Sequence, residues 1–507
     1  MAALKGPPYK KRRHVSCSPL AVMRIVVLFS LLVTTTASSV VAQVAVSGSL
    51  RTRAYSWDWF GDSANGDYMY PGSLARLAVW QSKTRYDWQL ELAVPFVLDL
   101  PADAIAPGAA GQLGLGATYF AANTSRTNAA AFFIKQGAIR FKFPRGLGSP
   151  GSLIGQSLKI GRMEFNDGAE VVPKNATLAA LKRDRISQRL LGNFGFSDVG
   201  RSIDGALYVL DIVSGAASNV TVLGGRPTQG VFQVDGWGEL NVNVFYGAWT
   251  RQLGGRANTG EWRVFALGYH DYRDGVLKTD NRLLATRRAD TESIKVATYG
   301  GHYLRIAETG AGPVDVLAWG ALQTGSWGTL AQRAGAFAAE VGWQPPLLQR
   351  LEPWIRGGYD YGSGDGDATD ETHGTFLHVL PTPRVYARFP FFNMMNCADA
   401  FGEIIVRPRK GVTVRTDVHA LRLADANDLW YTGGGAFQPA TFGYTGRPSN
   451  GQSGLATLYD VSGDYALNGH VGLGVYYGYA AGKPVTDAIY PDGDNAHFGY
   501  VELLFRF

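Results

Sequence analysis

Most of the chain reads as segments of about ten residues in which apolar and polar side chains alternate, with turns between the segments. Such a period-two pattern is typical of a β-strand with two different faces. The connections also alternate in length: residues 58–72 and 98–130 are long, and Thr84 between them is a tight turn. Near the end of the chain residues 424–454 are long, and residues 467–469 are tight. A transmembrane barrel has long loops at one end and short turns at the other. In a soluble sandwich the lengths of the connections are not expected to alternate in this way.

The final segment, Asn495–Phe507, alternates between an apolar and a mostly polar face. Val501, Leu503, Phe505 and Phe507 fall on the apolar face. In a soluble sandwich, the alternative fold, this strand would leave an apolar edge open to pairing. A closed barrel has no edge, and its apolar face meets lipid. A carboxy-terminal Phe on such a strand also resembles the assembly signal of bacterial outer-membrane barrels.

Eighteen such segments run from Val44–Trp57 to Asn495–Phe507. We therefore expect an all-β fold, a transmembrane antiparallel up-and-down β-barrel of eighteen strands within a range of about 16 to 18. An even number of strands returns the chain to its starting side, so both termini are expected in the periplasm. The last strand should pair with the first.

Several tryptophans fall near the ends of these segments. They fit either an aromatic girdle at the lipid headgroups or the ordinary preference of aromatic residues for strands. The residues concerned are Trp57, Trp59, Trp80, Trp88, Trp249 and Trp430.

The amino-terminal segment predicts export from the cytoplasm. The longest nearly apolar run, Ile25–Val33, follows the basic residues 10–13 and leads to Val40-Val41-Ala42. A basic start, a short apolar core and small residues before a cut describe a secretory signal peptide. We place cleavage after Ala42, so that residues 1–42 are the signal peptide and residues 43–507 form one outer-membrane barrel domain. Met23 is an alternative start.

The charge balance does not support nucleic acid as a partner. The whole chain has a formal charge of +6, but the predicted signal peptide carries six Lys and Arg residues and no Asp or Glu. The mature chain is therefore neutral, and no global basic field remains. Any preference for anions has to come from where the charges lie.

Charged residues within the strands should point into the lumen, because a charge at the lipid midplane costs about 2–4 kcal/mol in a barrel. Where the apolar face is clear, as at Phe141 and Phe143 or at Ile294 and Val296, the residues between are assigned to the inside. This rule gives a mainly basic lining of Arg140, Lys142, Arg263, Lys295, Arg356, Arg407 and Arg415. The planar fork of Arg binds carboxylates in a bidentate way. The same charges would also fit a general porin interior, in which they only keep water in the channel.

Leu158–Gly205 is the most distinctive stretch of the chain. Between two predicted strands it mixes many Lys and Arg residues with Asp and Glu, and Thr177–Leu191 predicts one or two helical turns with Thr177 as the cap. A loop this long in a compact barrel is usually functional or folded inward. A solvated extracellular loop is the alternative.

Four short elements of this stretch carry a family resemblance, and they are followed by a second group of motifs. The four are Gly161-Arg162-Met163-Glu164, Asp167-Gly168, Arg189-Leu190-Leu191-Gly192-Asn193-Phe194 and Arg201-Ser202-Ile203-Asp204-Gly205. The second group is Tyr361–Asp367, then Thr375-Phe376 and Leu380-Pro381-Thr382. Together with the terminal strand, these motifs resemble the alginate-export family of outer-membrane porins.

The resemblance implies a barrel that passively exports an anionic polysaccharide through an electropositive constriction. Matched by motif, Arg162, Arg189 and Arg201 are the candidates for that constriction, with Glu164 and Asp204 as their orienting partners. The implied partners are an alginate-like polyuronate and outer-membrane lipid, and docking of periplasmic export-complex proteins on the short turns is left open. No cofactor is expected.

Clustered carboxylates suggest one weak candidate for a metal site. Asp365, Asp367 and Asp370 lie close together in sequence, and carboxylate oxygens suit Ca²⁺. Their spacing lacks the full ligand series of a known Ca²⁺ loop, so an ordinary solvated loop is the alternative.

Two further functions are compared with polysaccharide export. A general anion-selective or small-solute porin for uptake would use the same basic lining. An outer-membrane enzyme would need a nucleophile with a His and a carboxylate, but the histidines are scattered and no convincing nucleophile motif lies near them. We therefore expect a channel and not an enzyme.

Overall fold

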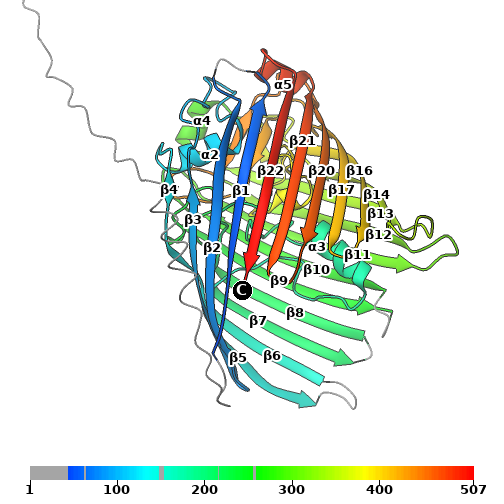
Figure 1. Ribbon diagram of the computed structural model, residues 1–507. Coiled ribbons are helices and arrows are strands. Elements are labelled where there is room, and N and C mark those ends of the chain that lie inside the picture. Colours follow the sequence, from blue (N-terminus) through cyan, green and yellow to red (C-terminus); the bar gives the residue numbers. More distant parts are fainter. Residues whose placement is uncertain (1–43, 62–63, 148–152, 215, 255–258) are drawn as a thin grey trace, which may run out of the picture. The chain divides into compact units, whose positions relative to one another are not determined.

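The computed structural model describes residues 44–61, 64–147, 153–214, 216–254 and 259–507, and this part of the chain forms a closed β-barrel (Figure 1). Eighteen wall strands pair antiparallel in chain order, and the last pairs with the first. The predicted eighteen-strand barrel is therefore confirmed. The wall strands are β1 (Ala45–Trp59), β2 (Tyr68–Ser82), β3 (Tyr86–Val97), β5 (Phe133–Leu147), β6 (Leu153–Met163), β7 (Ile203–Ser214), β8 (Ala216–Pro227), β9 (Val242–Leu253), β10 (Gly260–Asp271), β11 (Ile294–Ala307), β12 (Val314–Trp327), β13 (Leu330–Trp343), β14 (Trp354–Gly362), β16 (Cys397–Arg409), β17 (Val412–Arg422), β20 (Gly454–Ala466), β21 (Val471–Gly482) and β22 (Asn495–Arg506).

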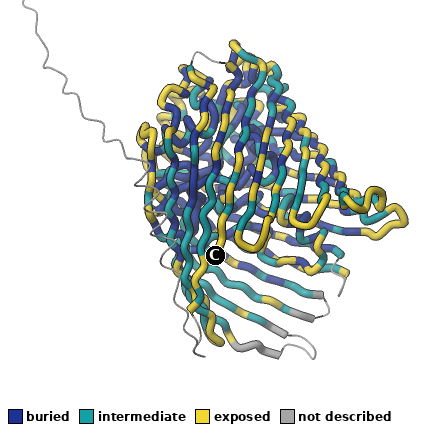
Figure 2. Tube along the Cα trace, in the orientation of Figure 1, coloured by how far each residue is buried: buried dark blue, intermediate teal, exposed yellow. Residues whose placement is uncertain are grey.

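Exposure alternates along the wall strands and distinguishes the lipid face from the lumen face (Figure 2). On β22, Val501, Leu503 and Phe505 are 57%, 49% and 45% exposed, as expected for side chains that face lipid. On the opposite face, Arg53 of β1 lies in register with Glu502 of β22, and the two form an ion pair at 2.7 Å. The first and last strands are thus joined both by backbone pairing and by this ion pair.

The connections differ in length at the two ends of the barrel. At the long-loop end they include residues 98–132, 164–202, 363–396 and 423–453, although residues 328–329 form a tight turn there. Among the described connections at the short-turn end, the longest is 344–353. The carboxy terminus lies at the short-turn end, where the carbonyl of Phe507 accepts a hydrogen bond from the Gly48 amide at 3.0 Å.

Long loops fill much of the lumen. Loop L3 (residues 164–202) and loop L7 (residues 363–396) meet in a parallel bridge between Leu191 and Leu380, and both residues are buried. No helix in the described part of the chain is long and apolar enough to cross a membrane. The short elements of the connections are α2 (Gly114–Ala122), β4 (Ala129–Ala130), α3 (Ala176–Arg185), α4 (Leu284–Ala289), β15 (Thr372–His373), η2 (Pro383–Val385), the hairpin β18 (Trp430–Gly433) and β19 (Tyr444–Arg447), and α5 (Pro484–Ile489).

Helix α3 explains why L3 enters the lumen. Its cap is Asn175, whose side chain accepts a hydrogen bond from the Leu178 amide at 3.1 Å, two residues before the cap expected from the sequence. Leu178 and Leu181 are fully buried, and Lys182 and Arg185 of the last turn bind carboxylates of the wall. The helix therefore has apolar and charged anchors inside the barrel.

An aromatic cluster lies inside the barrel near the long-loop end. Trp57 stacks on Phe498 at 3.9 Å, and Phe391 contacts both Trp59 at 5.5 Å and Trp430 at 4.8 Å between ring centroids. Trp57, Trp59 and Trp430 thus belong to the packed interior and not to a girdle. Trp80 and Trp249, by contrast, are 45% and 43% exposed.

Candidate functional site

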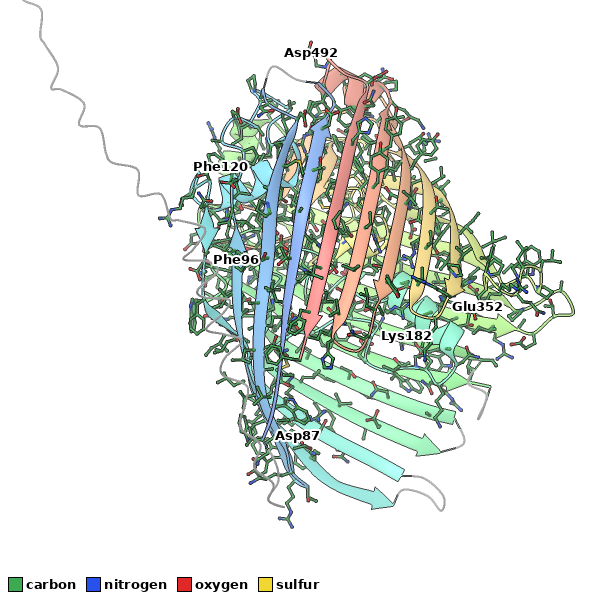
Figure 3. All side chains as sticks on the ribbon, in the orientation of Figure 1. Asp87, Phe96, Phe120, Lys182, Glu352 and Asp492 are labelled. Carbon is green, nitrogen blue, oxygen red and sulfur yellow. The ribbon has the colours of Figure 1, made fainter. Side chains whose placement is uncertain are left out.

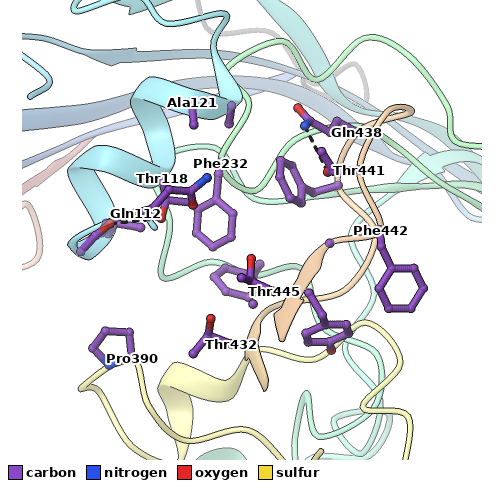
Figure 4. A pocket seen from close by; sticks show the side chains of 18 of the residues that line it. Gln112, Thr118, Ala121, Phe232, Pro390, Thr432, Gln438, Thr441, Phe442 and Thr445 are labelled. Carbon is purple, nitrogen blue, oxygen red and sulfur yellow. Dashed lines mark hydrogen bonds between the residues drawn. The ribbon is translucent and has the colours of Figure 1, made fainter. Parts of the chain in front are cut away.

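Two cavities lie inside the barrel and share part of their lining. The outer cavity, of about 420 Å³, lies among α2, the hairpin β18–β19 and the aromatic cluster (Figure 4). The inner cavity, of about 560 Å³, lies toward the short-turn end among L3, L7 and strands β17 and β21. Phe196 of L3 and Arg384 and Arg388 of L7 line both cavities. These three residues therefore lie between the two cavities.

Arg384 is a buried cation held only by backbone oxygens. Its guanidinium donates to the carbonyl of Phe392 at 3.0 Å, to that of Ala387 at 3.3 Å and to that of Phe389. No carboxylate of the described residues forms an ion pair with it. Burial lowers the pKa of Arg384 to about 10, so the side chain keeps its positive charge at neutral pH.

Arg388 and Phe196 are held from the wall. Arg388 lies 3.8 Å from Asp464 and over the ring of Tyr476, and its side chain is 24% exposed. Arg53 donates to the carbonyl of Phe196 at 2.6 Å and lies 4.9 Å from the centre of its ring. Arg388 and Phe196 are thus fixed by contacts with β1, β20 and β21.

The inner cavity has a basic lining. Five arginines face three carboxylates, a formal excess of two positive charges: Arg53, Arg183, Arg384, Arg388 and Arg415 against Asp184, Asp464 and Glu502. Arg415 lies 3.3 Å from both Asp184 and Glu403. Positive charge in a partly enclosed cavity raises the local concentration of anions.

A network of buried ion pairs fastens one side of α3 to the wall. Arg185 binds Glu340 of β13 with two contacts of 2.9 Å and lies 3.3 Å from Asp360 of β14. Arg189 binds Asp360 at 2.5 Å and is fully buried. Arg356 of β14 completes the network, 2.8 Å from Glu340. Arg185 and Arg189 therefore hold L3 in place, and their charges are paired with carboxylates of the wall.

A second group of contacts fastens the other side of L3. Lys182, which lies inside the barrel (Figure 3), is 2.7 Å from Glu261 of β10, and that carboxylate also contacts His302 at 3.0 Å. Arg263 of β10 lies 3.0 Å from Glu170. Loop L3 is therefore tied to β10 as well as to β13 and β14.

The structure corrects the constriction that the motifs suggested. Arg162 does bind Asp204, with contacts of 2.7 and 2.6 Å, but it shares a strand face with Ile160, which is 45% exposed on the outward side. Its neighbour Met163 is buried on the lumen side. The expectation that Arg162 and Asp204 line the constriction is therefore wrong.

Arg189 and Arg201 are also absent from the lining of the two cavities. Arg201 donates to the carbonyls of Gly434 and Ala436, forms no ion pair within the described residues, and has its pKa lowered to about 10 by burial. Glu164 binds Arg76 at 2.7 Å and lies 3.6 Å from Lys135, so it orients neither of them. The structure thus does not bring the motif arginines together.

The other predicted lining residues lie on the wall strands. Arg263, Arg356 and Arg415 face the lumen, as described above. Arg140 and Lys142 both contact Asp87, which lies toward the short-turn end (Figure 3), and the Lys142 contact is 2.6 Å long. Arg407 lies within the bulge between Val406 and Arg409 and is half-buried.

The assignment of Lys295 is wrong. Lys295 is exposed, whereas Ile294 and Val296 on either side are each only 2% exposed. The exposed Tyr299 and Tyr303 share the face of Lys295. The apolar face of β11 points inward here because it packs against luminal loops instead of lipid.

The suggested Ca²⁺ site is not assembled. Asp367 accepts hydrogen bonds from Thr369, and Asp370 accepts one from the Thr372 amide, so these carboxylates serve local turns. Within the described residues, Asp365, Asp367 and Asp370 do not converge as a group of possible metal ligands.

The residues at the boundary of the cavities were missed by the sequence reasoning. Arg384 and Arg388 lie in a stretch rich in Phe and Pro that gave no charge pattern, and Phe196 follows the motif segment by two residues. The signal that could have found them is the presence of two arginines in an apolar run that has no acidic partner.

Residues 243–489 match the alginate export family. The match confirms the predicted resemblance over this part of the chain, which includes the second group of motifs and both Arg384 and Arg388, but not Leu158–Gly205. No curated protein matches the chain significantly. Together with the closed wall and its exposed apolar face, the match supports an outer-membrane β-barrel channel.

Solved structures resemble the fold along the whole barrel. The crystal structures of OccAB1 and OccAB2 of Acinetobacter baumannii each have a TM-score of 0.54 at 10% identity and cover 92% and 91% of this chain and 96% and 98% of their own. OccK9 (OpdG) of Pseudomonas aeruginosa has a TM-score of 0.51 at 10% identity and covers 93% of this chain and 100% of its own. At this identity the likeness concerns the fold alone.

Proposed function

We propose that this channel passively exports an anionic polysaccharide, an alginate-like polyuronate, past the boundary formed by Phe196, Arg384 and Arg388. The observation that carries the proposal is the pair of luminal cavities that share two arginines in their lining, one of which has no carboxylate partner in the described residues. The match to the alginate export family favours a polysaccharide as the cargo.

The chemistry of the lining suits repeated carboxylates. An Arg guanidinium binds a carboxylate with strong, directional hydrogen bonds. Asp464 beside Arg388 and Glu502 beside Arg53 compete for the same guanidinium groups. This competition keeps each site weak enough for a chain to move on, which conduction requires.

The orientation follows from the lengths of the connections. Long loops face the outside in such barrels and short turns face the periplasm, so the inner cavity would receive the polymer first. Both termini then lie in the periplasm. Cleavage of the signal peptide after Ala42 belongs to the same proposal, and it predicts Gln43 as the first residue of the mature protein by amino-terminal sequencing.

Planar-bilayer recordings test the cargo and the arginines. The purified channel should prefer anions, and oligomers of a polyuronate added at the short-turn side should block its current. Arg388→Glu should lower or reverse the anion preference. Arg333→Glu is the matched control, because Arg333 shares the outward face of β13 with Phe337 and Val341 and carries the same change of charge. Cation preference without any block by polyuronate would overturn the proposal.

A second function is uptake of small anionic solutes. It is favoured by the size of the cavities, since about 420 and 560 Å³ lie in the range that holds a small molecule. Block by a monomeric uronate as strong as block by its oligomers would support uptake over polymer export.

A further inference from the structure

A group of three possible metal ligands lies on the lumen face of β17 and β20, outside the boundary described above. Asp417 and His419 lie two residues apart on β17, and Asp460 is paired with Asp417 in the register of the two strands. One ligand atom from each residue lies within 4.8 Å of the other two. Neither the family match nor the likeness in fold assigns a role to this group.

Each of the three residues keeps one side-chain atom without a hydrogen-bond partner in the described structure. Asp417 Oδ1, His419 Nε2 and Asp460 Oδ2 are buried, and within the described residues none of them has a hydrogen-bond partner. His419 is 1% exposed and Asp460 is 4% exposed. Buried polar atoms are almost always satisfied, so an unsatisfied atom on each of three residues whose possible ligand atoms cluster this closely calls for a bound partner.

Neighbouring groups already hold the ligands in place. The other ring nitrogen of His419, Nδ1, lies 2.7 Å from Asp399 Oδ2, and the hydroxyl of Tyr476 donates to Asp460 Oδ1 at 2.7 Å. A carboxylate on the second nitrogen of a histidine is the usual support of a metal-binding imidazole. It leaves Nε2, which has no hydrogen-bond partner within the described residues, as the nitrogen available to a metal ion.

The local charge favours a cation. Asp399, Asp417 and Asp460 surround a single imidazole, whereas the nearby Arg415 already contacts Asp184 and Glu403. Several carboxylates in a water-poor region are costly unless a positive charge compensates them.

We propose that Asp417, His419 and Asp460 bind a divalent transition-metal ion, with Zn²⁺ as the ion that suits them best. One imidazole nitrogen and two carboxylate oxygens are ligands of Zn²⁺, whereas Ca²⁺ and Mg²⁺ take oxygen ligands. Ligands about 2.0–2.2 Å from a tetrahedral ion lie about 3.3–3.6 Å apart, so modest side-chain movements close the site. The fourth position is left for water.

The site also touches loop L7. A Cβ at Gly478 would lie 2.6 Å from Asp460 Oδ1 and 2.9 Å from the ring of Phe389, so the wall packs closely against the segment that supplies the carbonyl bound by Arg384. A bound ion would therefore stiffen the wall beneath this segment. The inference does not depend on the cargo or direction of the channel.

Metal binding to the purified, untagged barrel tests the proposal. The protein is stripped with EDTA, dialysed, and titrated by calorimetry with ZnCl₂, MgCl₂ or CaCl₂, and bound metal is counted by mass spectrometry. We expect one Zn²⁺ per chain and no comparable binding of Mg²⁺ or Ca²⁺. Asp399→Asn should weaken Zn²⁺ binding about 10–100-fold, as loss of a supporting carboxylate does.

Two ligand variants and one control decide the outcome. His419→Gln and Asp460→Asn should abolish the binding, and Asp460→Asn nearly preserves side-chain volume if the first variant fails to fold. His302→Gln is the matched control, because His302 is also a buried histidine that contacts a carboxylate, Glu261, but lies outside the group. Folding is checked by heat-modified mobility in electrophoresis. Absence of Zn²⁺ binding to the wild type, or wild-type affinity in either folded ligand variant, would overturn the proposal.

Discussion

Glu340→Gln should release loop L3 without opening the barrel wall. Glu340 is buried and contacts three arginines, at 2.9 Å to Arg185, 2.8 Å to Arg356 and 3.8 Å to Arg189. The substitution keeps the shape of the side chain and removes its charge. Removing one partner of a buried ion pair costs about 3–5 kcal/mol. The ion pair with Arg356 lies within the wall and does not contribute to the docking of L3. We therefore assign about 3 kcal/mol of this cost to docking, which corresponds to roughly a 100-fold increase in the undocked population.

Limited digestion with trypsin measures this population. Lys182 and Arg185 lie on α3 and are 2% and 3% exposed, so trypsin reaches them only when L3 leaves the wall. Cleavage at these two residues should become about 100-fold faster in Glu340→Gln, if opening and closing are fast compared with cleavage. The barrel should keep its heat-modified mobility, because the eighteen wall strands are unchanged.

A surface ion pair provides the control. Glu239 pairs with Arg226 at 2.9 Å, but the two side chains are 48% and 41% exposed, and such pairs contribute about 0–1 kcal/mol. Glu239→Gln should therefore leave the cleavage rate within a few-fold of the wild type. An unchanged rate in Glu340→Gln would refute the assignment of this network as the anchor of L3.

Two further predictions concern the loops. Burial raises the pKa of Asp167 in L3 to about 6, above its usual value near 4. The carboxyl group therefore binds a proton more tightly in the docked loop than in the undocked loop. Asp167 accordingly contributes increasing stability to the docked loop as the pH falls from about 6 to 4. Asp167→Asn should remove that part of the pH dependence of trypsin protection, and an identical pH profile in the variant would contradict it. Arg201→Ala should loosen the hairpin β18–β19, because the carbonyls of Gly434 and Ala436 lose their buried donor at a cost of about 1–3 kcal/mol. Hydrogen exchange should become faster in this hairpin and stay unchanged in β22, and equal protection of the hairpin would contradict the prediction.

The wall could be predicted because one physical rule governs it. Each strand has to show lipid an apolar face, so alternation and connection lengths were enough to place the strands and to pair β22 with β1. The same rule put Arg53 and Glu502 on the lumen face, where they form their ion pair.

The rule failed where the lumen is packed with protein. At Ile294 and Val296 the inward face is apolar because luminal loops cover it, so the assumption that apolar residues face lipid reversed the orientation of Lys295. The tryptophans at the end of β1 were ambiguous for the same reason, since Trp57 and Trp59 pack against aromatic residues from L7 and β22. Period-two alternation alone does not distinguish a lipid environment from a protein core.

The site depends on contacts between loops distant in sequence. Phe196 and Arg384 come from different loops. They meet because Leu191 pairs with Leu380 and because charged side chains of L3 find partners on strands β10, β13, β14 and β17. No local sequence pattern encodes contacts between residues that lie so far apart in the chain. The motif at Arg162 correctly predicted a pair with Asp204. The side of the wall on which this pair lies follows only from the alternation of the surrounding strand residues.

Pairing of β1 with β22 also imposes an order on assembly. Arg53 and Glu502 are 449 positions apart, so the ion pair and the hydrogen bonds beside it form only after nearly the entire chain has been made and delivered to the membrane. Contacts of such long range are slow to form, because a large loop has to close before they stabilise anything. L3 and L7 come much earlier in the chain than β22, and they lie inside the finished ring. A chain that lacks β22 would expose both a free strand edge and its charged interior to lipid.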